Sequence, residues 1–177
     1  MKSAKWVCLL LAAGLSGCVG YHAGPSNGLS AGARSVRVDY FENQTLEPRL
    51  VVALNRALKK QLQQDGTYTL ESHDHADLIV TGQITEFLRN GISYQPGDVL
   101  TVKDYSLQIT ADLKVTDRAT GKVVLEQEVT GSTVVRVGTD FTSAQRQAVP
   151  LIAEHLAQLA TDLIVDGPWP GPPAAGP

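Results

Sequence analysis

Residues 104–116 alternate between apolar and polar side chains more regularly than any other part of the chain. Every second residue is apolar: Tyr105, Leu107, Ile109, Ala111, Leu113 and Val115. Successive side chains of a strand point to opposite faces of a sheet, so this segment predicts a strand with one buried face. A sheet with one apolar face must be covered by another layer, which restricts the chain to a few layered folds.

Several other segments have the alternation or composition of strands. The predicted strands are residues 35–41, 67–70, 77–87, 104–116 and 122–133, of which 67–70 is the weakest. In the first of them, Val36, Val38 and Tyr40 are expected on the buried side. Residues 90–98 contain Asn, Gly and a Pro-Gly pair and predict a loop or hairpin tip. Short connections make the last strands an antiparallel meander.

Two segments have helical periodicity. In the first, Thr45 is the expected N-cap, Glu47 and Pro48 suit a first turn, and Asp65-Gly66 ends the helix. Its apolar stripe consists of Leu50, Val51, Leu54, Leu58 and Leu62. The second helix covers residues 142–165, and Pro150 either kinks it or marks its true start.

This order of elements predicts an α+β fold. The expected architecture is a two-layer sandwich, in which two helices pack on one face of a mostly antiparallel sheet of four or five strands. The expected domain covers residues 34–166. Residues 167–177 (GPWPGPPAAGP) hold five prolines and three glycines and predict a disordered tail.

The first residues have the pattern of an export signal. Lys2 and Lys5 precede nine apolar residues, too few for a membrane-spanning helix. The following Leu15-Ser16-Gly17-Cys18 resembles the lipobox of bacterial lipoproteins. The resemblance implies cleavage between Gly17 and Cys18, lipidation of Cys18, and removal of residues 1–17. Residues 18–33 then form a flexible lipidated tether to a membrane. Val19, where inner-membrane lipoproteins of enterobacteria carry Asp, implies sorting to the outer membrane.

Charge and cysteine content narrow the class of protein. Removing 17 of 177 residues leaves 160, enough for one domain with a real core. Of 15 basic and 18 acidic side chains, two lysines leave with the signal peptide, so the mature net charge is −5. This charge gives no reason to expect nucleic-acid binding. Cys18 is the one cysteine that remains, so no intramolecular disulfide is expected.

The string Phe41-Glu42-Asn43-Gln44-Thr45-Leu46-Glu47-Pro48 resembles a motif of the lipopolysaccharide-assembly lipoprotein family, LptE. The pattern is F-x-N-x-T-x-E-P, so Phe41, Asn43, Thr45, Glu47 and Pro48 are the matching positions. Weaker matches are Gly20-Tyr21-His22, Ala76-Asp77, Ile92-Ser93-Tyr94 and residues 120–124. Pro150 and the proline-rich tail depart from the family pattern.

The resemblance implies a role and not a reaction. Members of the family sit in the lumen of an outer-membrane β-barrel, the LptD-like lipopolysaccharide translocon. They help this barrel to fold, plug it, and contact lipopolysaccharide during its insertion. The expected partners are therefore the barrel, lipopolysaccharide and, through the lipid anchor, the outer membrane. The alternative is a pilotin-like chaperone of another envelope machine.

Two sets of cations are candidate contacts to lipopolysaccharide or to the barrel. Arg49, Arg56 and Lys60 lie within about 40° of one another on a helical wheel. Guanidinium groups pair well with phosphate, although a solvated helix face is the simpler interpretation. The second set consists of Lys103, Arg118 and Lys122 at strand ends and turns.

No residues predict catalysis. His73 and His75 are too few for a metal site, and a solvated loop is the favoured interpretation. The pattern G-x-S-x-G occurs at Gly24–Gly28 and at Gly28–Gly32, but both copies lie in the predicted tether and not between a predicted strand and a predicted helix. The chain contains no phosphate-binding glycine loop and no H-E-x-x-H. We therefore expect a protein that is not an enzyme and that holds no cofactor and no metal.

Overall fold

The computed structural model describes residues 31–73, 75–138 and 140–167. The expected signal peptide, the lipidation of Cys18, most of the tether and the tail from residue 168 lie outside the described residues.

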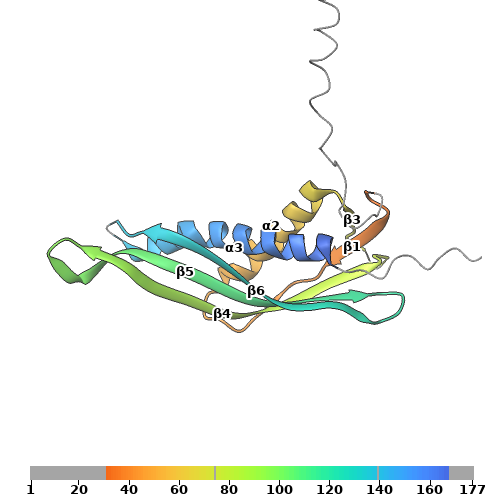
Figure 1. Ribbon diagram of the computed structural model, residues 1–177, viewed down its shortest axis with the longest axis horizontal. Helices are drawn as coiled ribbons and strands as arrows, with labels where there is room; N and C mark the ends of the chain where they lie inside the picture. The colour runs from red at the N-terminus through yellow and green to blue at the C-terminus, as the bar shows by residue number, and fades with distance from the viewer. Residues whose placement is uncertain (1–30, 74, 139, 168–177) are drawn as a thin grey trace, which may run out of the picture.

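The described chain folds into two helices and a six-stranded mixed sheet (Figure 1). The strands are β1 (Arg34–Val38), β2 (Glu42–Asn43), β3 (Tyr68–Leu70), β4 (Leu78–Gln95), β5 (Asp98–Asp117) and β6 (Val123–Arg136). The helices are α2 (Arg49–Asp65) and α3 (Phe141–Asp166). The predicted α+β class with two helices is correct. The predicted four or five strands are wrong, because the sheet has six.

The sheet order is β3-β1-β4-β5-β6, with β2 paired to β4 beyond the end of β1. β1 pairs in parallel with both β3 and β4, because α2 carries the chain back between β1 and β3. β4, β5 and β6 form the predicted antiparallel meander. Both helices lie on the same side of the sheet, with α3 over β5 and β6 and α2 beside α3 (Figure 1).

The apolar face of β5 is buried as predicted. Leu107, Ile109, Ala111, Leu113 and Val115 are all in the core. Gly131 of β6 lies directly under α3, where an added Cβ would be 2.7 Å from Cβ of Leu156 and 2.9 Å from its backbone nitrogen. The helix and strand backbones therefore touch at this point, and any side chain on residue 131 would separate them.

Residues 90–98, predicted as a loop or hairpin tip, form the tip of the β4–β5 hairpin and are mostly strand. β4 continues to Gln95, and only Pro96 and Gly97 form the turn. A bulge between Ile84 and Glu86 shifts the pairing with β5 by one residue. Bulges increase the local twist of a strand, and the alternation of β4 is interrupted there. The alternation of apolar and polar residues in β4 therefore stops before the strand itself ends, and the sequence did not show the full length of the strand.

The position of Tyr40 is a second difference from prediction. Tyr40 is 74% exposed, whereas its neighbour Phe41 is buried at 4%. β1 ends at Val38, so the strand alternation does not reach Tyr40. The ring of Tyr40 instead lies 5.5 Å from Nζ of Lys59, a cation–π contact with α2.

The first helix begins later than predicted. α2 starts at Arg49 with Pro48 at the N-cap, so neither Thr45 nor Glu47 lies in its first turn. Its end is as predicted, since Gly66 adopts φ 74° and its N–H donates to the carbonyl of Leu62. The predicted leucine stripe is also correct, because Leu50, Leu54, Leu58 and Leu62 are buried.

The second helix contains Pro150 in its interior, so the alternative in which Pro150 starts the helix is wrong. Asp140 caps α3 by accepting hydrogen bonds from the backbone N–H groups of Thr142 and Ser143. By length and composition α3 could cross a membrane, but 56% of its apolar window is buried within the fold. Burial against the sheet and α2 accounts for its apolar composition.

Candidate functional site

The F-x-N-x-T-x-E-P string builds the loop that leads into α2. Oδ1 of Asn43 accepts hydrogen bonds from the N–H and the hydroxyl of Thr45, at 2.9 and 2.7 Å. Nδ2 of Asn43 donates to the carbonyl of Glu47 at 3.1 Å. Oε2 of Glu47 accepts from Nε2 of Gln145 at 2.7 Å, which ties the loop to α3. These residues therefore fix where α2 begins relative to α3, with Pro48 at its N-cap.

Phe41 anchors the start of this loop on the sheet. Its ring lies against Gly82 of β4, where an added Cβ would be 2.7 Å from Cδ1 of Phe41. The same Cβ would be 2.5 Å from the backbone oxygen of Asp112. Only glycine leaves room for the aromatic ring at this position. The motif residues are thus structural, and they position the first cation of α2, Arg49.

The predicted stripe of Arg49, Arg56 and Lys60 lines a groove of about 780 Å³ between α2 and α3. We call this surface the interhelix groove. Its apolar lining residues are Pro48, Val52, Ala53, Ala57, Val149 and Pro150, and the buried Ala57 and Val149 form its floor. Arg146 of α3 contributes a fourth cation. Sequence periodicity could not identify Arg146, because periodicity within one helix does not show which residues of another helix lie opposite.

The interhelix groove has an excess of positive charge. Glu154 is the one acidic residue among those that line it, and its Oε1 lies 3.4 Å from Nζ of Lys60. Nε of Arg49 lies 3.6 Å from Oε1 of Glu47. Both side chains of the Lys60–Glu154 pair are well exposed, so this pair contributes little to stability. Four cations above an apolar floor suit an amphiphile that carries phosphate and hydrocarbon.

The second predicted set of cations does not cluster. Lys103 lies toward the β4–β5 turn, whereas Arg118 and Lys122 lie at the opposite end of β5 and β6. At about 3.3 Å per residue, roughly 45 Å of strand separates them. Beside Lys103, Asp104 accepts hydrogen bonds from the hydroxyl of Ser93 and from Nε of Arg136. These bonds hold the pKa of Asp104 below its usual value, the bond from Ser93 contributing most.

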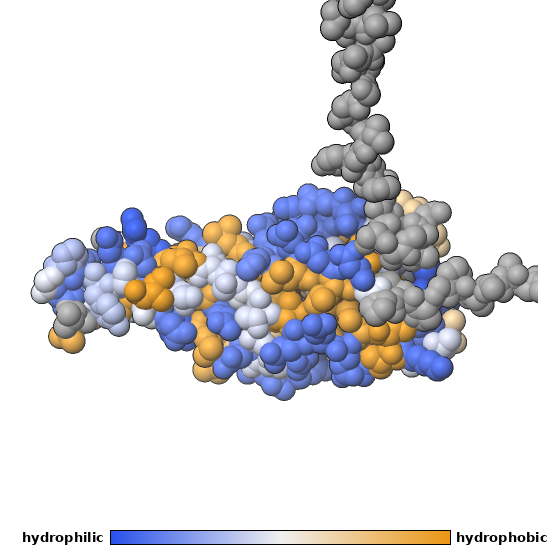
Figure 2. All heavy atoms as spheres, in the orientation of Figure 1, coloured by the Kyte–Doolittle hydropathy of each residue, from blue (hydrophilic) through white to orange (hydrophobic). Residues whose placement is uncertain are grey.

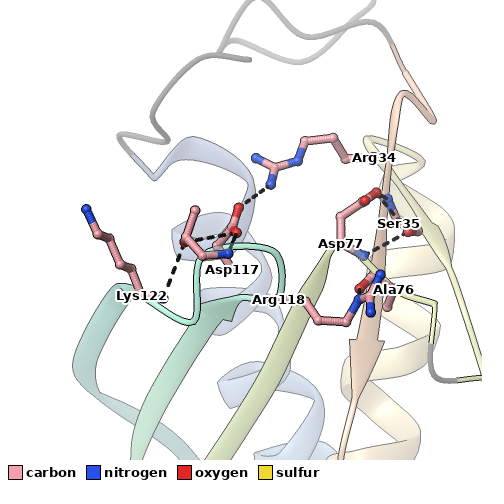
Figure 3. A network of polar contacts seen from close by, with 8 residues as sticks. Arg34, Ser35, Ala76, Asp77, Asp117, Arg118 and Lys122 are labelled. Carbon is pink, nitrogen blue, oxygen red and sulfur yellow. Dashed lines mark hydrogen bonds and ion pairs between the residues drawn. The ribbon is translucent and has the colours of Figure 1, made fainter. Parts of the chain in front are cut away.

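Arg118 takes part in a network that joins three strand ends (Figure 3). Oδ2 of Asp77 accepts hydrogen bonds from the N–H and hydroxyl of Ser35, at 2.8 and 2.9 Å. Nε of Arg118 donates to the carbonyl of Ala76 at 2.8 Å. The backbone bond from Ser35 is the main reason that the pKa of Asp77 is lowered. Arg118 thus has a structural partner, which weakens its candidacy as a ligand contact.

The other half of this network closes the β5–β6 turn. Nη2 of Arg34 lies 2.9 Å from Oδ2 of Asp117. Oδ1 of Asp117 accepts from the N–H of Thr120, which is the main cause of the lowered pKa of Asp117. The side chain of Lys122 points away from the network (Figure 3) and is exposed.

Tyr94, the last of the motif residues, lies near the tip of the β4–β5 hairpin. It is half exposed, as is Ile92, and Leu100 is 89% exposed. The hairpin projects beyond the helices (Figure 1). His73 and His75 are also exposed, and the described residues contain no group of three or more potential metal ligands.

Two solved structures have a similar fold at low sequence identity. The hypothetical protein CT253 from Chlamydia trachomatis matches with TM-score 0.54 and 10% identity, over 75% of this chain and 96% of that one. Protein XCC0632 from Xanthomonas campestris matches with TM-score 0.54 and 12% identity, over 80% of this chain and 87% of that one. At these identities the likeness concerns the fold alone. A comparison with curated protein sequences gave no match.

The family comparison agrees with the resemblance based on the Phe41–Pro48 string. The family model described as "LptE: Lipopolysaccharide-assembly" matches residues 33–166, which is more than half of the chain and contains every described helix and strand. This chain belongs to the LptE family of lipopolysaccharide-assembly lipoproteins.

Proposed function

We propose that this lipoprotein binds and plugs the β-barrel translocon of lipopolysaccharide and aids the insertion of lipopolysaccharide into the outer membrane. Lipid on Cys18 anchors it to that membrane. The protein acts by binding and is not an enzyme. Membership of the LptE family supports the general role in lipopolysaccharide assembly.

The observation that carries the contact with lipopolysaccharide is the composition of the interhelix groove. Lipopolysaccharide carries phosphates on a sugar core and several acyl chains, so it requires cations beside an apolar surface. The groove offers Arg49, Arg56, Lys60 and Arg146 around an apolar floor. Arg56 and Arg146 are both exposed where they line the groove, which leaves both guanidinium groups accessible to phosphate.

The groove is tested with two double variants that each remove two cations. Arg56→Ser with Arg146→Ser changes the interhelix groove, and Lys103→Ser with Lys122→Ser changes the strand ends. A hydrogen bond to a charged group contributes about 1.5–3 kcal/mol. If the double variant loses the equivalent of one such bond, at the lower end of this range, its affinity for purified lipopolysaccharide should fall about tenfold. The strand-end variant should bind within about twofold of wild type. The reverse order of affinities would move the site to the strand ends.

The partner is tested by affinity purification from detergent-solubilised envelopes. A tagged chain should recover a large outer-membrane β-barrel, and depletion of the chain should lower surface lipopolysaccharide. Recovery of a different envelope machine, with normal surface lipopolysaccharide after depletion, would instead favour the pilotin-like alternative. A Cys18→Ala variant should lose membrane anchoring while the domain still folds, since residue 18 precedes every described element.

A further inference from the structure

The outer edge of β6 has no strand beside it among the described residues. β6 ends the sheet order and is 14 residues long, whereas β3 at the other edge has only three. A long exposed edge presents unpaired backbone N–H and C=O groups to any extended chain. Most proteins cover or interrupt such an edge, so an edge left open over several residues requires an explanation.

One side chain shows which backbone groups point outward. Nδ1 of His155 in α3 lies 3.1 Å from the nitrogen and 2.9 Å from the oxygen of Ser132. Both backbone groups of Ser132 therefore face away from β5. Outward-facing groups recur every second residue, so those of Thr130, Glu128 and Glu126 also face outward. The pairing of β6 with β5 is regular over this stretch. His155 thus closes the edge at Ser132 and leaves it open before that residue.

An apolar groove lies along the open part of the edge. We call it the edge groove; its volume is about 480 Å³, and β6 lines it with residues 127–130. The apolar side chains that line it are Leu125 and Val129 of β6 and Leu159 and Leu163 of α3. Apolar surface is visible in this view where α3 lies above β6 (Figure 2). A strand added to β6 would place every second side chain against these residues.

Charge around the edge groove selects the occupant. Glu126 and Glu128 are exposed on the sheet face away from the helices, where Glu126 lies opposite Lys114 and Glu128 lies opposite Asp112. Asp162 and Asp166 line the groove on the helix side. Opposite charges on adjacent strands are favourable and like charges are not. An added strand should therefore carry Lys or Arg on this face, above all beside Glu128, which has no cation opposite it on β5.

We infer that the edge of β6 from Glu126 to Thr130 is a strand-addition site for an extended segment of a partner protein. The segment alternates apolar residues, which face α3, with Lys or Arg, which face the glutamates. Backbone pairing supplies affinity and the alternate side chains supply specificity. This inference does not depend on lipopolysaccharide binding at the interhelix groove.

Two other occupants fit less well. A second copy of the chain, paired through its own β6, would bring two sets of acidic residues together. The segment 167–177 of this chain has five prolines, which lack the N–H that pairing needs, and it has no Lys or Arg. A basic segment from a different protein is the occupant that both the hydrogen bonds and the charges favour.

The test uses the full-length protein in detergent and a labelled probe peptide of sequence Lys-Val-Lys-Val-Lys-Val-Lys. Fluorescence anisotropy should show binding, and hydrogen exchange should slow in the peptic fragment that contains residues 125–131. One peptide is N-methylated at its valines and a second at its lysines. Because alternate N–H groups of a strand point to opposite edges, one methylated peptide should lose at least about tenfold in affinity and the other should not. Equal affinities for both would refute strand addition.

Matched variants locate the site on β6. Glu128→Pro and Val134→Pro each remove an outward N–H that β5 does not use, which an edge strand tolerates. The first should weaken peptide binding about tenfold, and the second should change it less than about twofold. Glu128→Gln is the control for the carboxylate that Glu128→Pro also removes, and it should weaken binding less than Glu128→Pro. Circular dichroism checks that both variants fold. A Leu163→Ser variant, outside the strand, should also weaken binding. No binding by wild type, or equal effects of the two proline variants, would overturn the inference.

Discussion

The contact between Phe41 and Gly82 allows the role of a family motif to be measured. A Gly82→Ala substitution adds one methyl group beneath the ring of Phe41. The added carbon would lie 2.7 Å from Cδ1 of Phe41 and 2.5 Å from the backbone oxygen of Asp112. Unstrained carbon contacts are about 3.5–4.0 Å, so both neighbours would have to move by roughly 1 Å.

The two clashes differ in how they can be relieved. The Phe41 ring can shift only by leaving its buried position, and the Asp112 oxygen belongs to the backbone of β5. Overpacking of a core costs about 1–3 kcal/mol, and we expect Gly82→Ala near the upper end because a backbone atom is involved. Phe41→Ala should cost about 3–5 kcal/mol, the usual range for a buried aromatic ring.

The double variant separates the ring clash from the backbone clash. When Phe41 is already alanine, the methyl group of Ala at position 82 meets only the Asp112 oxygen. The double variant should therefore be more stable than the sum of the single effects by about 1–2 kcal/mol, a coupling typical of residues in contact. Urea unfolding followed by far-ultraviolet circular dichroism measures all four free energies. Additive effects would show that the ring does not limit residue 82, and the reasoning would fail.

Three further predictions concern stability. Asp140→Ala removes the N-cap of α3 and should lower the free energy of unfolding by about 1 kcal/mol in urea titrations, whereas Asp140→Asn should lower it less. Gly131→Ala forces α3 away from β6 at Leu156 and should cost about 2–3 kcal/mol, measured in the same way. The pKa values of Asp77 and Asp117 lie below the usual value of an aspartate, so their ionised forms stabilise the fold above the unfolded pKa. That stability should be lost as pH falls through the lower folded values, and Asp77→Asn should reduce the slope of unfolding free energy against pH in this acid range.

The parts of the fold that could be predicted from sequence are those governed by local periodicity. The alternation in β5 and the leucine stripe of α2 both survive in the structure because each has one buried and one exposed side. The end of α2 could also be predicted from the sequence, since Gly66 supplies the positive φ that the C-cap needs. These side chains face either water or the apolar core, so their positions could be predicted without knowing which residues lie next to them.

Features that depend on distant neighbours were missed. Thr45 looked like an N-cap, and its hydroxyl oxygen does accept from the N–H of Glu47, but this bond lies in the loop before α2, which begins four residues after Thr45. β1 pairs in parallel with both β3 and β4, but this pairing could not be predicted because it does not change the alternation of side chains in β1. Arg146 joins the predicted stripe only through the packing of α3 on α2. Local periodicity therefore predicted the part of the interhelix groove that α2 contributes, whereas the part that α3 contributes was set by tertiary packing.

α3 contributes to both candidate surfaces from different sides of one helix. Arg146, Pro150 and Glu154 line the interhelix groove, and Leu159 and Leu163 line the edge groove. A ligand in one groove could influence the other only by moving α3 relative to the sheet. The close contact of Gly131 with the backbone of Leu156 leaves no space for α3 to approach β6, and retreat would open the core around this contact. The two grooves should therefore bind their occupants independently, so that an anionic lipid and a basic strand can be held at the same time.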